Sequence, residues 1–143
     1  VAQAIQQMWK QTLGIEVGIA NQEWQTYLDT LDEDAPQIWR LGWCWDYGDP
    51  HNGLGDVFRS TSGNNHTSWG SEEFDAILDQ AKVMTDFEAR KPLYARAEHI
   101  LTWEDAAIAP IYFYVKVSMI GKNVESSPSI IGIERYDKWD IKS

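Results

Sequence analysis

With 143 residues, 43% of them apolar and 24% charged, the chain has the composition of one globular domain, and it shows neither a membrane-spanning run of about 20 apolar residues nor a signal-peptide pattern. Its 12 basic and 22 acidic residues give a formal charge of −10, which argues against binding to nucleic acid or to an anionic membrane. The single cysteine, Cys44, excludes an internal disulfide and a cysteine-based zinc site, and the start at Val1, inside a helical pattern, leads us to expect a processed product or an excised fragment.

An initial helix and a strand–helix–strand unit are predicted for the N-terminal part of the chain. Residues 1–13 carry one apolar stripe at helical spacing, and Gly14 follows where a C-cap glycine belongs. Alternating apolar side chains predict strands over residues 15–19 and 37–45, and Asn21 is the expected N-cap of the helix between them. A strand, a crossover helix and a second strand form a βαβ unit, which favours parallel pairing.

A long irregular loop is predicted over residues 46–70. It contains five glycines, and we expect one short helix within it, near residues 54–58. Long segments without regular structure are uncommon inside compact domains and usually carry function. This loop is therefore the first candidate for a functional site.

Two helices, a strand and a tail are predicted for the remainder of the chain. Ser71 is the expected N-cap of the first helix. Asp86 is a candidate start of the second helix, but Pro92 interrupts it, so its regular part is expected to begin near Lys91. The mostly apolar run of residues 108–120 predicts a buried strand. Residues 121–143 are expected to form a loop with short extended pieces that pack its tyrosine and its tryptophan.

The densest chemistry lies where the predicted strand of residues 37–45 ends, which in open α/β sheets is the place where ligands bind. Two indoles, a phenol and two carboxylates are crowded there. They belong to Trp43, Trp45, Asp46, Tyr47 and Asp49. An aromatic wall with a carboxylate suits an amino group, through Coulomb attraction and cation–π contact, and it equally suits a sugar ring stacked on an indole. The structural alternative is a strand end packed by aromatic side chains and capped by an Asx turn.

Other chemistry is less well supported by the sequence. Asp46 and Asp49 form a candidate catalytic pair of a hydrolase, but their separation along the chain fixes no distance between the carboxylates. A calcium site would use the oxygens of Asp46, Asp49, Asn52 and Asp56, at a spacing that misses the EF-hand pattern. His51 and His66 lack a second clustered pair of metal ligands. Cys44 is expected to be a small buried residue, because nothing near it in the sequence would produce a reactive thiolate. We expect no metal, no cofactor and no catalysis.

Motifs along the chain resemble those of a known family. The segment Trp43-Cys44-Trp45-Asp46-Tyr47-Gly48-Asp49-Pro50 is similar to a segment of the family 5 extracellular solute-binding proteins, the dipeptide and oligopeptide receptors of ABC importers. Further motifs follow in the family's order. They are Asn65 with Trp69, Glu73-Phe74-Asp75, the series Asp86, Arg90, Leu93-Tyr94, Ala97-Glu98 and Ile100-Leu101, and Ala109-Pro110-Ile111-Tyr112. Their order and spacing carry the resemblance over about residues 1–120.

The resemblance implies an α/β fold, namely part of the second lobe of a type II periplasmic-binding-protein-like fold. In this lobe a βαβ unit is followed by a long loop, two helices and a buried strand. Residues 1–120 would form a partial ligand-binding C-terminal lobe. Residues 121–143 would form a C-terminal tail that packs on the missing first lobe. Because family members are several times longer, the chain is expected to be a C-terminal fragment.

The resemblance also implies a function. The chain would belong to the substrate-binding component of an ABC transporter, which captures a peptide outside the cytoplasmic membrane and delivers it to the permease subunits. Such a protein would be periplasmic or extracellular, and anchoring to the membrane as a lipoprotein is compatible with this interpretation. We expect a monomer when the protein is intact, no enzyme activity and no nucleic-acid partner.

Site residues are carried over from the family position by position. Asp46 matches the family carboxylate that pairs with the α-amino group of a peptide. Trp43 and Cys44 match positions beside the ligand, where backbone groups pair with the peptide main chain, and Asn65 matches a ligand-side position loosely. The expected ligand-binding residues are Trp43, Cys44, Trp45, Asp46, Tyr47 and Asn65.

Two departures from the family pattern leave the ligand class open. Trp45 stands where the family often has a small residue, and Gly48 replaces a frequent proline. An indole at position 45 would narrow the pocket or offer a platform for a sugar, so an oligosaccharide receptor is the alternative within the family. Outside it stand a carboxylate-based hydrolase and a plain interaction domain whose aromatic side chains are all buried in a core.

Overall fold

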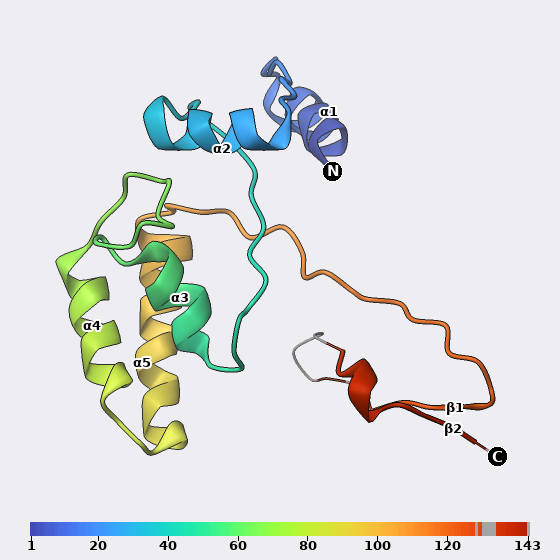
Figure 1. Ribbon diagram of the computed structural model, residues 1–143. Coiled ribbons are helices and arrows are strands. Elements are labelled where there is room, and N and C mark those ends of the chain that lie inside the picture. Colours follow the sequence, from blue (N-terminus) through green and yellow to red (C-terminus); the bar gives the residue numbers. More distant parts are fainter. Residues whose placement is uncertain (128, 130–133, 143) are drawn as a thin grey trace. The chain divides into compact units, whose positions relative to one another are not determined.

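The computed structural model describes residues 1–127, 129 and 134–142 (Figure 1). The chain divides into two compact units, Val1–Trp39 and Arg40–Ser143. No helix of the described residues has the length and apolar character needed to cross a membrane. The boundary expected near residue 120 is a different division, between a lobe and a tail, and it stays a prediction.

The first unit contains two helices, α1 (Ala2–Leu13) and α2 (Trp24–Glu33). As predicted, α1 ends at Gly14, whose φ of 69° lies in the left-handed region that glycine adopts readily. The N-cap of α2 is Glu23 rather than the predicted Asn21. Its carboxylate accepts hydrogen bonds from the first-turn backbone, as a capping side chain does, so the helix begins two residues later than an Asn21 cap implies.

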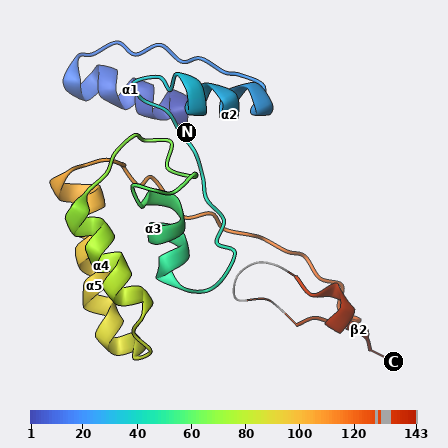
Figure 2. The same cartoon turned by 60° about the vertical axis from the view of Figure 1, so that its left-hand side comes forward.

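The second unit is built around three helices, α3 (Pro50–Phe58), α4 (Glu72–Lys82) and α5 (Phe87–His99). They lie side by side in both views (Figures 1 and 2), and a π-helical turn, Ile100–Glu104, extends α5. The core lies between these elements. Its buried members are Phe74, Leu78, Ala81, Tyr94, Ala97, Ile100 and Leu101. Because α3 packs on this core, its opposite side is held in a fixed position.

The starts of α4 and α5 show how local signals set helix boundaries. Ser71 caps α4 as predicted, with its hydroxyl accepting from the backbone N–H of Phe74 at 3.3 Å. Asp86 caps α5, which confirms it as the candidate start, but the regular helix begins at Phe87 rather than near Lys91. Pro92 is tolerated inside α5 because it lies on the exposed face, where a backbone carbonyl that loses its helical partner can bind water.

The three predicted strands, over residues 15–19, 37–45 and 108–120, are not formed in the described part of the chain. The strands present there are β1 (Val124–Glu125) and β2 (Asp140–Ile141), which pair antiparallel. An alternating or apolar pattern shows which faces a segment can bury, whereas a strand also needs a neighbouring backbone in register. Without such a neighbour the predicted strands stay unpaired.

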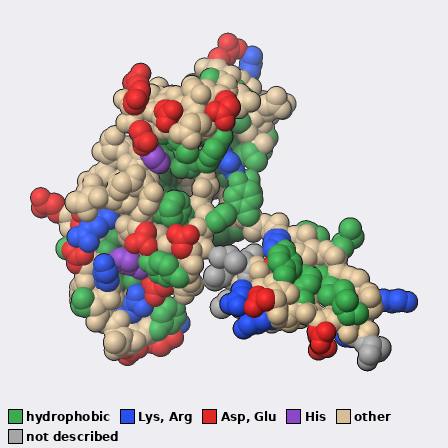
Figure 3. Space-filling view, viewed as in Figure 1, with side chains coloured by type: hydrophobic (Ala, Val, Ile, Leu, Met, Phe, Trp, Pro, Cys, Tyr) green, Lys and Arg blue, Asp and Glu red, His purple; other side chains and the backbone are tan. Residues whose placement is uncertain are grey.

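The burial predicted for residues 108–120 is wrong as well. The side chains of Phe113 and Met119 are 96% and 99% exposed. Hydrophobic side chains accordingly lie on the surface over the C-terminal part that carries β1 and β2 (Figure 3).

The two aromatic side chains of the tail pack on each other. The rings of Tyr136 and Trp139 meet edge to face, with centroids 5.0 Å apart. A 3-10 turn, Tyr136–Lys138, places them together.

Candidate ligand-binding site

The N-terminus of α3 organises the aromatic and acidic segment. Pro50 occupies the first helical position and Asp49 is the N-cap, whose carboxylate accepts from the backbone N–H of His51 at 2.9 Å. An Asp-Pro pair is a strong start signal, because proline has a helical φ and the aspartate satisfies a free N–H. The helix therefore begins at Pro50, four residues before the predicted residue 54.

Asn52 joins the aromatic and acidic segment to α3. Its side chain is buried, with 1% of the residue exposed. Its Oδ1 accepts hydrogen bonds from the indole Nε1–H of Trp43 and from the backbone N–H of Asp46, each at 3.0 Å. Its Nδ2 donates to Asp56 Oδ2 at 3.1 Å and, at a longer 3.4 Å, to Asp46 Oδ2. One buried amide thus holds a tryptophan and a carboxylate of the predicted site.

Tyr47 is held by the same helix. Its hydroxyl donates to Asp56 Oδ2 at 2.5 Å. Burial and the adjacent Asp56 carboxylate raise the pKa of Tyr47 to about 12, because the phenolate is disfavoured in both respects. The phenol therefore remains a neutral hydrogen-bond donor near neutral pH.

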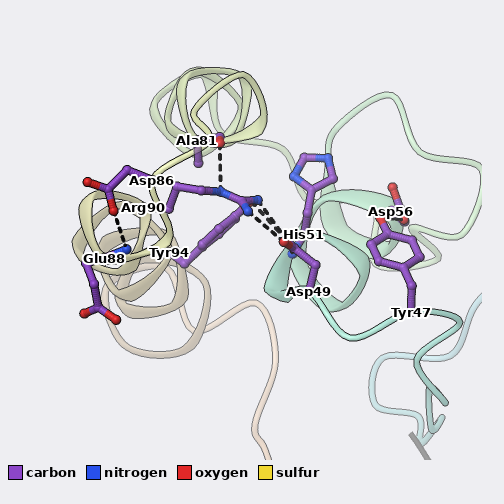
Figure 4. A network of polar contacts seen from close by, with 9 residues as sticks. All are labelled: Tyr47, Asp49, His51, Asp56, Ala81, Asp86, Glu88, Arg90 and Tyr94. Atoms are coloured by element: carbon purple, nitrogen blue, oxygen red, sulfur yellow. Dashed lines mark hydrogen bonds and ion pairs between the residues drawn. The ribbon is translucent and has the colours of Figure 1, made fainter.

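Asp49 ties the start of α3 to the other two helices through Arg90 (Figure 4). The guanidinium donates to both Asp49 oxygens, at 2.7 and 3.0 Å, and to the backbone carbonyl of Ala81 at 3.0 Å. It also donates to the Tyr94 hydroxyl at 2.5 Å. Burial alone would raise the pKa of Asp49, but the Arg90 guanidinium and the His51 backbone N–H hold it below its ordinary value. Asp49 is thus an ionised structural group.

His51 is buried beneath this network. Its ring lies edge to face with that of Tyr94, with centroids 6.4 Å apart, and it covers Gly55, where an added Cβ would lie 2.7 Å from the imidazole. Burial lowers the pKa of His51, so the ring is neutral at pH 7. Within the described residues, no three of the His, Cys, Asp and Glu side chains gather closely enough to hold a metal ion.

The aromatic side chains of the segment are partly exposed. Trp43, Trp45 and Tyr47 are 38%, 44% and 41% exposed. The Trp45 indole lies against α3 at Gly53, where an added Cβ would come within 2.9 Å of its Nε1. Cys44 is exposed, which corrects the burial expected from its small size. This exposure contradicts the interpretation in which all these aromatics are core residues.

Asn65 lies within the loop that follows α3. Its Nδ2 donates to the backbone carbonyls of Phe58, Arg59 and Trp69, and its Oδ1 accepts from the backbone and hydroxyl of Thr67. These contacts hold the loop closed on itself. The structure gives the side chain this internal task, and its contact with a ligand stays a prediction.

The structure therefore brings Trp43, Asp46 and Tyr47, from the segment before α3, together against this helix. Asn65 belongs to a separate set of loop contacts. In the sequence Asn52 stood out only as a calcium ligand, and its role as a hydrogen-bonding centre was not predicted. A usable signal was present, because Asn52 and Asp56 stand four residues apart and so share one helix face.

Two hollows in the surface are lined by residues outside this segment. One is lined by Gln6, Gln7, Lys10, Ile15, Glu16 and Val17, and the other by Lys116, Ser118, Ile120, Ser126, Ser129, Glu134 and Trp139. The candidate site is formed by the segment before α3 and by the helix itself.

Comparison with known proteins gives a consistent result. Residues 1–65 match the family model of bacterial extracellular solute-binding proteins, family 5 Middle. The oligopeptide-binding protein OppA of Bacillus subtilis is 40% identical over 126 residues, which make up 87% of this chain and 23% of that protein. The periplasmic oligopeptide-binding protein OppA of Salmonella typhimurium is 38% identical over 120 residues, 84% of this chain and 22% of that protein.

A solved structure matches as well. The periplasmic murein tripeptide-binding protein MppA, in its unliganded open form, superposes with a TM-score of 0.78 and 35% identity over 87% of this chain and 24% of that one. This match shows the expected fold class, part of an α/β type II periplasmic binding protein, although the strands predicted between residues 15 and 120 are unpaired in the described residues. The chain spans less than a quarter of the length of these relatives.

Proposed function

The chain is related in sequence and fold to the family 5 bacterial extracellular solute-binding proteins, and we propose that it forms part of the peptide-binding surface of such a protein. Its periplasmic relatives support a location outside the cytoplasmic membrane, in the periplasm or extracellular space. There it would hand its peptide to the permease subunits of an ABC importer. The intact protein would act as a monomer, and a lipid anchor is compatible with this role.

The observation that carries the proposal is the setting of Asp46. The side chain is exposed, its backbone N–H and its Oδ2 face the buried Asn52, and Oδ1 accepts no hydrogen bond within the described residues. The indole of Trp43 is held by the same amide. A fixed carboxylate beside an aromatic face suits the ammonium group of a peptide.

The backbone before Asp46 supports recognition of an extended peptide. Within the described residues, positions 41–45 take part in no backbone–backbone hydrogen bond. Their N–H and C=O groups can therefore pair with a peptide added as a strand, with Trp43 and Cys44 beside it. Trp45 and Tyr47 would supply apolar contact to its side chains.

The state of Asp49 supports binding rather than catalysis. A hydrolase that used Asp46 and Asp49 would need one carboxylic acid and one carboxylate. Asp49 is held ionised by the bidentate Arg90 contact, with its pKa below the ordinary value, and it caps α3. Asp49 is thus occupied by structural contacts, and as an ionised group it does not suit the general-acid role in such a pair.

An oligosaccharide ligand is the second candidate, and the exposed indole of Trp45 favours it. The indole lies against α3 at Gly53 and is 44% exposed, so part of it is available to a sugar ring. The two ligands differ in charge. Because ammonium recognition depends on Coulomb attraction, peptide binding should weaken as salt rises, whereas the binding of a neutral sugar should not.

Native mass spectrometry of the intact gene product, purified without refolding, tests the proposal. We expect a ladder of bound masses that match short peptides. A single bound mass with hexose spacing would move the ligand to the sugar class and overturn the peptide assignment. A spectrum without bound ligand would be followed by parallel titrations with peptides and oligosaccharides, and absence of peptide binding there would refute the proposal.

A further inference from the structure

We propose that Asn52 is a positioning residue that orients the Asp46 carboxylate and the Trp43 indole as one unit, and that it thereby sets the preference for a free amino terminus. The inference rests on the proposed peptide-binding function and deepens it. Asn52 itself is buried and touches no ligand. It acts through the two side chains that it holds.

The orientation of the Asn52 side-chain amide is fixed by its hydrogen bonds. A side-chain amide has two acceptor positions on its oxygen and two N–H donors. Asn52 uses all four, because its oxygen receives two N–H groups and its nitrogen faces two carboxylates. A flipped amide would oppose N–H to N–H and oxygen to oxygen, so only one orientation satisfies the network.

The Asn52 side-chain amide is carried by a rigid element, the helix α3. Asn52 lies on α3, whose N-terminus is fixed by Asp49 and Arg90 and whose other side packs on the core. Asp56, one turn later on α3, accepts hydrogen bonds from the side-chain N–H of Asn52 and from the hydroxyl of Tyr47. The position of Asn52 therefore determines the position of Trp43 and Asp46 in the segment before the helix.

Asn52 leaves one oxygen of the Asp46 carboxylate and the aromatic face of Trp43 for a ligand. Asn52 uses the backbone N–H of Asp46 and faces its Oδ2, so a ligand amine meets a carboxylate with Oδ1 as its unoccupied acceptor. The indole of Trp43 is fixed by its Nε1, which sets the angle of its aromatic face. If Asn52 did not hold Asp46, the carboxylate would carry the same charge but would have no fixed direction.

Asn52→Asp separates charge from position, because the two side chains have nearly the same shape. The introduced carboxylate would still accept from Trp43 and from the Asp46 backbone, but it would set an oxygen against the carboxylates of Asp46 and Asp56. Repulsion should turn the Asp46 side chain away. The double variant Asn52→Asp/Asp56→Asn restores the net charge and an amide–carboxylate pair within α3, while the introduced oxygen still faces Asp46.

The experiment compares the affinity of the intact gene product for a free tripeptide and for the same tripeptide acetylated at its amino terminus. We expect Asn52→Asp to reduce the ratio of the two affinities by about tenfold or more, as expected for a weakened charge-assisted contact. The double variant should regain thermal stability without regaining the ratio. The control is Asn21→Asp, the same change at an exposed position outside this network. Recovery of both stability and ratio in the double variant would mean that Asn52 is only structural, and an unchanged ratio in Asn52→Asp would overturn the proposal.

A second readout needs no ligand. The indole N–H resonance of Trp43, assigned with Trp43→Phe, should shift and exchange faster with solvent in an Asn52→Leu variant, because its acceptor is gone. If no peptide binds to the wild-type protein, the proposed function fails, and this resonance still decides whether Asn52 holds the indole. An unchanged resonance would refute the positioning role.

Discussion

At the scale of single residues, Asp46 is the side chain on which ligand recognition most depends. Replacement by Asn keeps the shape and removes the charge. We expect Asp46→Asn to weaken the binding of a free-amine peptide by about 1.5–3 kcal/mol, roughly 10- to 150-fold in Kd, because a hydrogen bond to a charged group is lost. Isothermal titration calorimetry measures this.

Glu98→Gln provides the control for Asp46→Asn, since it makes the same charge change at an exposed position on α5. Its effect on affinity should be small. Equal affinity of Asp46→Asn and wild type for the free-amine peptide would remove the amine-binding role of Asp46.

Gly55 provides a second prediction at this scale. Its Cα faces the His51 ring so closely that an added Cβ would lie 2.7 Å from the imidazole, and both residues are buried. Gly55→Ala should therefore lower the free energy of unfolding by about 1–3 kcal/mol, the usual effect of overpacking. Chemical denaturation gives the value.

Gly63→Ala is the matched control, because nothing lies within 4 Å of an added Cβ there and its φ is not positive. This variant should be neutral or slightly more stable, since alanine restricts the unfolded chain. Equal effects of the two alanine variants would contradict the close contact between Gly55 and His51.

At the scale of elements, Arg90 connects α3, α4 and α5, and its environment differs from that of a similar pair nearby. The side chains of Arg90 and Asp49 are 13% and 26% exposed, whereas those of Arg59 and Asp79 are 31% and 53% exposed, and both pairs are bidentate. Breaking a shielded pair leaves a charge without its partner, whereas exposed pairs contribute little.

We therefore expect Arg90→Leu to destabilise the protein by about 1–3 kcal/mol and Arg59→Leu by about 0–1 kcal/mol. Urea denaturation of both variants measures the difference. A double-mutant cycle with Asp49→Asn should show coupling between positions 49 and 90. Independent, additive effects would mean that the ion pair does not join the helices.

Helix boundaries followed from local signals in most cases, and strands did not. The Gly14 and Ser71 caps act through their own neighbours in the chain, so the sequence alone was enough to find them. The start of α5 was misplaced because Pro92 was given more weight than the Asp86 cap, although its exposed position makes the lost hydrogen bond tolerable. Strand pairing depends on a distant backbone, and the pattern of residues 108–120 contains no information about its partner.

The candidate site shows the same limit. The chemistry of Trp43, Asp46 and Tyr47 was visible in the sequence, because the residue types and their place at the end of an extended segment suffice. The contacts that hold these side chains in place were not visible in the sequence. Arg90 reaches Asp49 across 41 positions of sequence, and no local pattern reports such a pair. Only the helix-face spacing of Asn52 and Asp56 offered a local clue.

At the scale of the whole molecule, buried titratable groups make stability depend on pH. The pKa of His51 is lowered by burial from its ordinary 6.5, so the unfolded chain binds more protons between the two values. Its contribution is complete above pH 6.5 and is lost as pH falls through the folded value. The lowered pKa of Asp49 acts at more acid pH, where its contribution is present above 3.8 and lost below.

Urea denaturation at a series of pH values tests this dependence. Stability should decline below pH 6.5, and His51→Gln should reduce the slope between pH 7 and 5 even if its overall stability is lower. A His51→Gln slope equal to that of the wild type would show that the decline has another origin.

The exposed run of residues 111–120 has a consequence for the handling of this chain. It is rich in aromatic and β-branched side chains, and Lys116 is its only charged residue. That charge acts as a gatekeeper against intermolecular strand addition, yet its Nζ lies 3.2 Å from Glu134 Oε1, which neutralises it. We expect concentration-dependent self-association, visible in sedimentation velocity, that Val117→Lys suppresses and Lys116→Val increases. Storage at high concentration is therefore a risk that arises from an unpaired segment rather than from any weakness of the helical core.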